Sequence, residues 1–318
     1  MRVTLVQLAE IRAAARSMST EVVRTPLLVA NWSRRPLWLK AESLQPIGAF
    51  KLRGASHALA RLDPKQRRAG VVTHSSGNHA QAVAYAARSM GCRATVVMPR
   101  TVNPSKLAAT EALGAEVVLV EPDERESTAL SIASELGAAL VPPYDDEAVI
   151  TGQGTVGLEI VDDLPDVELV LVPVSGGGLI AGVAAAVKGL RPDALVVGVE
   201  PELAGDLAES FRAGRRVTWP VEKTARTIAD GLRVSGVGET NWTHIRALVD
   251  DVVTVSEDAI RAAMRTLAFS SRLVAEPSGA VATAAVLELG DSLPPGRTVA
   301  VVSGGNVDPQ LYAEVLRV

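Results

Sequence analysis

The chain has 318 residues, of which 47% are hydrophobic, so it can bury the core of one large α/β domain or of two smaller ones. Its formal net charge is −4, and acidic and basic residues are spread along the chain without a basic stripe. This distribution argues against nucleic acid or an anionic membrane surface as a partner, and it favours small-molecule chemistry.

Features of export and membrane insertion are missing from the sequence. Cys92 is the only cysteine, so an intramolecular disulfide is excluded. The first 17 residues carry charges within a helical pattern, unlike a signal peptide, and no run approaches the roughly 18 apolar residues of a membrane helix. We therefore expect a soluble cytoplasmic protein with no membrane partner.

From Gly70 onward, short apolar runs alternate with Ala-rich periodic stretches, a pattern typical of βα units and a largely parallel sheet. The predicted strands cover 71–74, 94–98, 116–120, 169–174, 195–199 and 298–302. The predicted helices cover 79–90, 104–113, 127–136, 148–161, 257–270 and 280–289, and one more ends at Leu190. No low-complexity linker or repeat interrupts the pattern, so any two domains must be intimately joined.

A glycine run, Gly176-Gly177-Gly178, stands between a predicted apolar strand and a predicted helix. Glycine lets the backbone approach an anion closely, and the free amides at a helix start can bind it. The run therefore indicates a phosphate site. Two alternatives stay open. With Ala181 the run also fits the dinucleotide pattern G-x-G-x-x-A, with Glu200 after the next strand, and it can equally be a tight turn that binds nothing.

Two further polar turns follow predicted strands. Residues 75–79, Ser-Ser-Gly-Asn-His, offer hydroxyls, a carboxamide and an imidazole beside helix-start amides, which suits a substrate carboxylate. Alternatively, Ser76 or Asn78 simply caps the helix that follows. Residues 303–306, Ser-Gly-Gly-Asn, end the last strand and should open on the same carboxyl-end crevice if the sheet is parallel.

Lys51 lies between two apolar residues, Phe50 and Leu52. A lysine is ordinarily solvated, and that is the simplest interpretation of this one taken alone. Apolar neighbours, however, can desolvate an amine and lower its pKa, which is what Schiff-base chemistry requires.

Taken together and in order, these segments resemble the signature segments of fold-type II pyridoxal-phosphate enzymes, in particular the serine/threonine dehydratase and serine racemase family. The resemblance extends over essentially the whole chain, and an ordered set of motifs is more specific than any one of them. The segments that carry it are 43–46 (SLQP), 50–54 (FKLRG), 75–79 (SSGNH), 152–155 (GQGT), 173–179 (PVSGGGL), 227–231 (TIADG), 276–279 (EPSG) and 303–306 (SGGN).

The resemblance implies a role for each candidate side chain. Lys51 would carry pyridoxal 5'-phosphate as a Schiff base, with Phe50 packing against the pyridine ring and Asn78 hydrogen-bonding the phenolic oxygen. Ser303 would meet the pyridine nitrogen, and a hydroxyl there disfavours transamination because it does not protonate the ring. The phosphate would be bound by the amides of Ser175, Gly176, Gly177, Gly178 and Leu179. The substrate would lie at Ser75, Ser76, Asn78 and His79.

The resemblance also implies an architecture, with a large domain of residues 1–52 and 147–318, a small α/β domain of residues 53–146, and the cofactor in the cleft between them. Two positions depart from the family pattern. Ser175 replaces a glycine that many relatives carry, which is compatible with phosphate binding if its φ is negative. Val234 stands where animal serine racemases carry serine, which favours a dehydratase over a racemase.

The segment 200–206 resembles the divalent-cation loop of the same family. Glu200 and Asp206 would supply carboxylates, and Ala204 would supply its backbone carbonyl. Oxygen-only ligands suit Mg²⁺, Ca²⁺ or Mn²⁺. The alternative is that these acidic residues belong to an ordinary solvated loop.

The activity that the resemblance implies is α,β-elimination of L-threonine or L-serine to a 2-oxo acid and ammonia, with Lys51 removing the Cα proton. Ser76, on the opposite face of the cofactor, would allow weak racemisation. A serine racemase, a 3-hydroxyaspartate dehydratase, an NAD-dependent dehydrogenase and a non-catalytic amino-acid-binding protein are the alternatives. Resemblance further implies a homodimer. Because the sequence ends soon after Ser303, we expect no C-terminal regulatory domain and no feedback by isoleucine through one.

Overall fold

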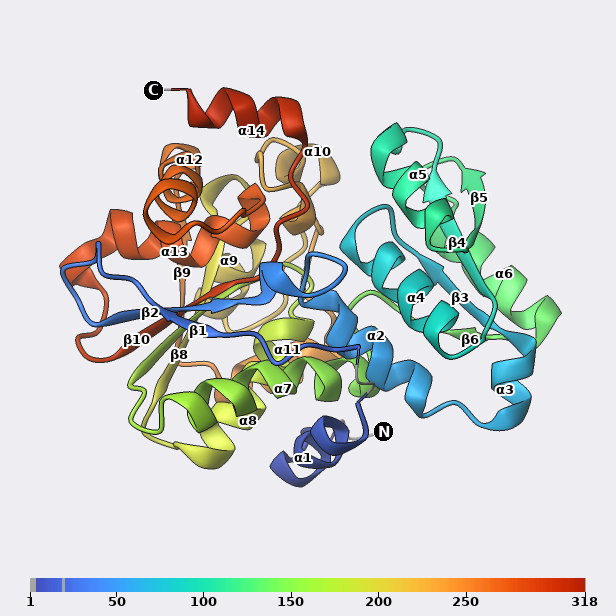
Figure 1. Ribbon diagram of the computed structural model, residues 1–318, viewed down its shortest axis with the longest axis horizontal. Helices are drawn as coiled ribbons and strands as arrows, with labels where there is room; N and C mark the ends of the chain where they lie inside the picture. The colour runs from blue at the N-terminus through green and yellow to red at the C-terminus, as the bar shows by residue number, and fades with distance from the viewer. Residues whose placement is uncertain (1–3, 19–20, 318) are drawn as a thin grey trace.

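Two groups of strands build two separate sheets in the computed structural model, which describes residues 4–18 and 21–317 (Figure 1). The larger sheet has the order β1-β2-β10-β7-β8-β9, and the smaller has the order β5-β4-β3-β6. Neighbouring strands pair in parallel except β1 with β2. The strands are β1 Leu27–Val29, β2 Leu37–Ala41, β3 Val71–His74, β4 Ala94–Pro99, β5 Glu116–Val120, β6 Ala139–Leu140, β7 Leu169–Pro173, β8 Leu195–Pro201, β9 Asp251–Val255 and β10 Thr298–Val302.

The helices follow the βα alternation that the sequence predicts. They are α1 Leu8–Ser17, α2 Lys51–Ala60, α3 Pro64–Ala69, α4 Asn78–Ser89, α5 Pro104–Ala112, α6 Arg125–Leu136, α7 Glu147–Asp163, α8 Gly178–Leu190, α9 Asp206–Ala213, α10 Val221–Thr224, α11 Glu239–Leu248, α12 Glu257–Thr266, α13 Pro277–Leu289 and α14 Pro309–Leu316. One predicted helix differs, because 257–270 is α-helical only to Thr266 and continues as a π-helical turn, Leu267–Ser271. Among the helices of the described residues, none combines the length and the apolar character that crossing a bilayer requires.

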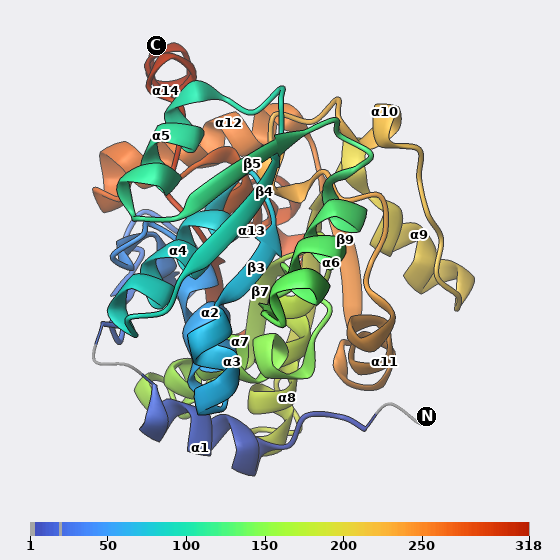
Figure 2. The same cartoon turned by 90° about the vertical axis from the view of Figure 1, so that its right-hand side faces the viewer.

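The smaller sheet is covered on both faces, and alternate side chains of its strands serve the two faces. Val71 and Val96 pack with α2 and α4, whereas Val72 and Val97 pack with α6. Figure 2 shows this sheet with α4 on one side and α6 on the other. The apolar strands predicted at 71–74, 94–98 and 116–120 are thereby confirmed.

The larger sheet is built in the same way from longer apolar strands. Val170 and Val172 of β7 face the layer of α7 and α8, while Leu171 faces the layer of α12 and α13. All three side chains are fully buried. Burial on both faces explains why β7, β8 and β10 are continuous apolar runs rather than alternating ones. Their carboxyl ends lead into the glycine loop, the Glu200 loop and the last polar turn.

Helices α7 and α8 pack with their backbones in contact, and this contact sets the distance between the two helices. A Cβ atom on Gly182 would lie 2.3 Å from the Ile150 carbonyl oxygen, and one on Gly157 would lie 2.7 Å from the Val183 carbonyl oxygen. Real Cβ atoms do not approach oxygen so closely, so both positions require glycine.

We predict that Gly182→Ala lowers the free energy of unfolding by about 1–3 kcal/mol, because the added methyl group forces the two helices apart. Gly189→Ala, on an exposed part of the same helix, is the matched control, since its Cβ would meet only the Leu8 side chain at 3.1 Å. That control should be neutral or stabilising by up to about 1 kcal/mol through helix propensity. Denaturant titrations measure both, and equal effects would contradict the close-contact interpretation.

Candidate active site

Three segments far apart in the sequence meet just before helix α2. The Phe50 amide donates to the Ser303 carbonyl at 3.0 Å, and the Gly305 amide donates to the Gly48 carbonyl at 2.8 Å. Asn306 Nδ2 donates to Asn78 Oδ1 at 2.8 Å. The structure therefore brings the lysine segment, the 75–79 turn and the 303–306 turn together, as the sequence analysis expected.

Lys51 is the first residue of α2, and its amine is withdrawn from solvent. Nζ donates to the Pro143 carbonyl at 2.5 Å and lies 5.2 Å from the centre of the Phe50 ring. Burial lowers the pKa of the Lys51 amine to about 8. A larger fraction of the amine is therefore neutral near pH 7 than for an ordinary lysine, which is the form that attacks a carbonyl.

The glycine loop that precedes α8 has the features of an anion site. Gly177 has φ +94°, a left-handed conformation that favours glycine, and α8 begins at Gly178. Within the described residues, none of the amide N–H groups from Ser175 to Leu179 donates a hydrogen bond to a protein acceptor. Those groups are available to an anion at the positive end of the helix dipole.

The serine at the start of this loop does not strain it. Among the described residues, Arg272 is the only non-glycine with a positive φ, so Ser175 avoids the left-handed region. Its Oγ accepts a hydrogen bond from the Val234 amide at 3.3 Å. The two departures from the family pattern are thus neighbours in space.

The sequence analysis missed Tyr144, whose ring covers the glycine loop. A Cβ on Gly176 would lie 2.4 Å from the Tyr144 ring, so glycine is needed there for packing as well as for flexibility. Asn241 Nδ2 holds the two segments together by donating to the Tyr144 carbonyl at 3.2 Å and to the Gly176 carbonyl at 2.6 Å. The sequence of residues 142–144 predicts an ordinary turn. No signal in the sequence links this turn to the glycine loop, which lies 32 residues further along the chain.

The 75–79 turn is not a simple helix cap. The N-cap of α4 is Gly77, and no side chain caps the helix, so the alternative of capping by Ser76 or Asn78 is wrong. The Asn78 carboxamide instead donates to Glu276 Oε1 at 2.6 Å. His79 is buried with Nε2 3.1 Å from the Val141 carbonyl oxygen, and burial together with the charge of Lys51 lowers its pKa to about 3.

The remaining candidates lie near this centre with fewer contacts. Ser303 is buried, and within the described residues its hydroxyl makes no hydrogen bond. Ser75 Oγ accepts from the Gly77 amide at 3.4 Å, and no hydrogen bond in the described part of the chain joins Ser76 to Lys51. Both serines are half-buried on the turn that carries Asn78.

The candidate cation loop is more buried than an ordinary acidic loop. Glu200 is fully buried and accepts the Leu207 amide at 3.2 Å and the Ala208 amide at 2.8 Å. Asp206 is equally buried, and its Oδ2 has no hydrogen-bond partner. Burial and the charge of Asp206 raise the pKa of Glu200 well above its usual value, and burial raises that of Asp206 to about 7. Two carboxyls in this state are stabilised by a cation.

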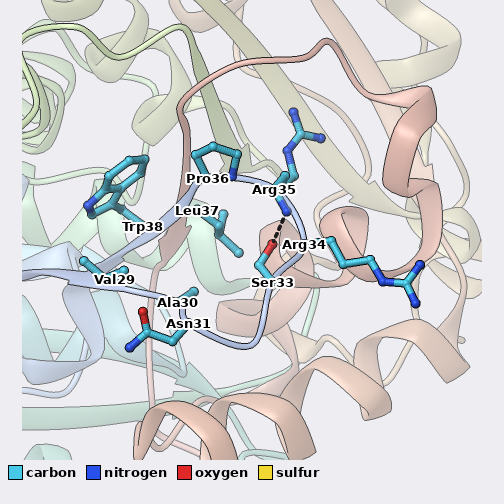
Figure 3. A pocket seen from close by; sticks show the side chains of 9 residues that line it. All are labelled: Val29, Ala30, Asn31, Ser33, Arg34, Arg35, Pro36, Leu37 and Trp38. Atoms are coloured by element: carbon cyan, nitrogen blue, oxygen red, sulfur yellow. Dashed lines mark hydrogen bonds between the residues drawn. The ribbon is translucent and has the colours of Figure 1, made fainter.

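A hollow also lies away from this site. Figure 3 shows one at the turn between β1 and β2, lined by Arg34 and Arg35 among others. The Arg35 guanidinium is committed to the backbone carbonyls of Gly290 and Pro294. Two of the three Arg35 guanidinium nitrogens are thereby taken up by the protein backbone.

A sequence model of the family described as "Pyridoxal-phosphate dependent enzyme" matches residues 18–304. The chain belongs to this family. It is 42% identical to the L-threonine ammonia-lyase of Thermotoga maritima over 98% of this chain and 78% of that protein. A solved threonine deaminase, from T.th., is 45% identical, with a TM-score of 0.89 over 95% of this chain and 99% of that one. Maize serine racemase is 37% identical, with a TM-score of 0.92 over 98% and 97% of the two chains.

These similarities confirm the fold-type II interpretation, with two mostly parallel open sheets. They also decide against the dinucleotide interpretation of the glycine run. The residues present fit pyridoxal phosphate, because the desolvated Lys51 amine binds the Pro143 carbonyl and the next residue, Tyr144, packs on the glycine loop whose amides are free. An aldehyde needs the amine and a phosphate needs the free amides.

We predict that borohydride reduction of the pyridoxal-phosphate-loaded protein labels Lys51, because its amine is the desolvated one. Lys51→Ala should lose the label and nearly all turnover, since the attachment point and the base are removed together. Lys188→Ala, which breaks the ion pair with Asp250 and a hydrogen bond to the Pro192 carbonyl, is the control and should keep both. Peptide mapping reads the result, and a label on another lysine would contradict the assignment.

Proposed function

We propose that this enzyme converts L-threonine or L-serine, or both, to the corresponding 2-oxo acid and ammonia. The proposal rests on one observation, the similarity over nearly the whole chain to proteins named threonine ammonia-lyase and threonine deaminase. In the overall reaction the Cα proton and the β-hydroxyl leave, and the resulting enamine hydrolyses to the 2-oxo acid and ammonia. Bound pyridoxal phosphate supplies the electron sink that stabilises the negative charge at Cα.

The chain's own residues support the steps around that sink. Lys51 would hold the cofactor and then, as a free amine with a lowered pKa, take the Cα proton. The amides of 175–179 would bind the phosphate, and Ser303 would meet the ring nitrogen with a neutral hydroxyl. Asn78 would bind the phenolic oxygen, and Phe50 would pack on the ring.

The turn of residues 75–79 would hold the substrate. Its amides at the start of α4 suit the carboxylate of an amino acid. Ser76 would lie on the face of Cα opposite Lys51, where its hydroxyl can exchange a proton. Serine racemase remains the second candidate because maize serine racemase shares this fold at 37% identity.

We predict that the purified enzyme forms 2-oxo acid and ammonia in equal amounts from L-threonine, and much more 2-oxo acid than D-serine from L-serine. The reason is that Val234 stands where animal racemases carry serine, so the racemase substrate contacts do not carry over to this pocket. Ser76→Ala should suppress D-serine while sparing much of the L-serine dehydration. A coupled oxo-acid assay with chiral chromatography measures both products, and D-serine as the main product would establish a racemase. Exclusive turnover of 3-hydroxyaspartate would establish that dehydratase instead.

We further propose a divalent-cation site at Glu200, the Ala204 carbonyl and Asp206. The two buried carboxyls and the unpartnered Asp206 Oδ2 support it. In the part of the chain that the structure describes, no group of three or more His, Cys, Asp or Glu side chains is arranged to hold a metal ion. A cation here would therefore take two carboxylates, backbone oxygen and water, which suits Mg²⁺, Ca²⁺ or Mn²⁺.

A metal-free preparation should lose stability as the pH rises from the ordinary aspartate value of 3.8 to about 7. Over that range the unfolded chain releases protons that the folded Glu200 and Asp206 retain, so ionisation disfavours the folded state. Adding Mg²⁺ or Ca²⁺ above pH 7 should restore the melting temperature, and Glu200→Gln should abolish the response. Glu202→Gln, on the exposed side of the same loop, is the control and should respond like the wild type. If neither a chelator nor an added cation changes the melting temperature, the proposed cation site is wrong and the loop has only a structural role.

The quaternary state and location are also proposals. We propose a homodimer, supported by the exposed apolar side chains of Leu44, Phe269 and Val274. The segments that carry Leu44 and Val274 lie close together, because a Cβ added to Gly305 would contact both Ser43 and the Val274 carbonyl. A cytoplasmic location is supported by the single buried free cysteine, Cys92. We also propose two domains, a large one of residues 1–52 and 147–318 and a small one of residues 53–146. The presence of two separate sheets supports this division.

A further inference from the structure

A backbone carbonyl determines how the Asn78 carboxamide is oriented. The Ile47 carbonyl can only accept, so the Asn306 group that faces it at 2.8 Å must be the NH₂. The same NH₂ faces Asn78 at 2.8 Å, so the Asn78 atom there must be the carbonyl oxygen. The Asn78 NH₂ therefore faces Glu276, which accepts at 2.6 Å. One N–H of Asn78 remains for a ligand.

Glu276 is the N-cap residue of α13, and glycines of two motifs leave room for its carboxyl group. Its side chain is buried, and a Cβ on Gly304 would lie 2.1 Å from Oε1. A Cβ on Gly279 would lie 2.0 Å from the Gly304 carbonyl, and the Glu276 amide donates to that carbonyl at 3.1 Å. The glycines of the 276–279 and 303–306 motifs thus let the carboxyl reach Asn78.

The charged groups that act on Glu276 come from two other elements. Among the described residues these are Asp230, in the 3₁₀ turn Asp230–Leu232, and Lys106 on α5, which form an ion pair with each other. Burial and the charge of Asp230 raise the pKa of Glu276 to about 7, against the opposing effects of Asn78 and Lys106. The carboxyl therefore changes its charge in the range where the enzyme would work.

We propose that Glu276 is a positioning residue that acts through Asn78, aiming the free N–H of Asn78 at the cofactor's phenolic oxygen and placing a carboxyl group one carboxamide away from it. This rests on the proposed role of Asn78. An ionised Glu276 strengthens its bond to Asn78 and favours the protonated form of groups on the cofactor. A neutral Glu276 does neither.

The test is a pH titration of the visible absorbance of the pyridoxal-phosphate-loaded enzyme. Glu276→Gln keeps the acceptor oxygen but removes the charge, so the absorbance midpoint should move to lower pH and cofactor affinity should fall by about tenfold. Glu257→Gln is the matched control, because this carboxyl of the same domain accepts from the Ile228 amide and does not touch Asn78. It should leave the midpoint unchanged.

Two further measurements separate the ways in which the proposal can fail. Asn306→Ala removes the donor that orients Asn78 and leaves Glu276 intact, so it should weaken cofactor binding with little change in the midpoint. In cofactor-free protein, Glu276→Gln should become more stable relative to wild type as pH rises from 4.5 to about 7, since only in the wild type does the unfolded chain release a proton that the folded state retains. Loading without Lys51 labelling would reject the proposed function. Normal labelling with identical midpoints and affinities for Glu276→Gln and Glu257→Gln would overturn this proposal alone.

Discussion

Helix α2 is held at its first turn by a guanidinium group that is closed off from solvent. Arg53, two residues after Lys51, binds Glu42 through Nε and Nη2, both at 2.8 Å, and Glu159 through Nη1 at 2.7 Å and Nη2 at 2.8 Å. Lys40 Nζ also binds Glu159, at 2.6 Å, so two buried cations meet two carboxylates. Removing one partner from such a network costs about 3–5 kcal/mol, which restricts α2, and with it the Lys51 amine, to one position.

The same helix lies between the two sheets (Figure 1). It packs against α7, which covers the larger sheet, and against α4, which covers the smaller one. A Cβ on Gly152 of α7 would lie 2.6 Å from the Arg53 carbonyl, so α7 and α2 are in backbone contact. Because α4 begins with Asn78 and α2 begins with Lys51, one pair of packed helices sets the distance between the two candidate cofactor contacts. The packing of these two helices therefore determines the geometry of the candidate site.

The sequence was informative where local rules dominate and silent where distant segments meet. Strands 71–74 and 298–302 were predictable because apolar runs bounded by turn residues need no partner to be recognised. Strand β2 was not predicted, because it carries Lys40, whose burial depends on a carboxylate 119 residues away. The polar turns could be found by their composition. The contact of Asn78 with Glu276 joins residues 198 positions apart, and only the three-dimensional packing reveals it.

Burial shifts the titratable groups around the site toward their neutral forms. The pKa of the Lys51 amine falls to about 8, that of His79 falls to about 3, and that of Glu276 rises to about 7, in each case chiefly through desolvation. The loop of residues 175–179 carries no charged side chain either. An anionic phosphate would therefore be held by backbone N–H groups and a helix dipole, which need no counter-charge and do not titrate. Proton transfer at Lys51, if it is the base as proposed, would then change charge within the site without disturbing the groups proposed to bind the phosphate.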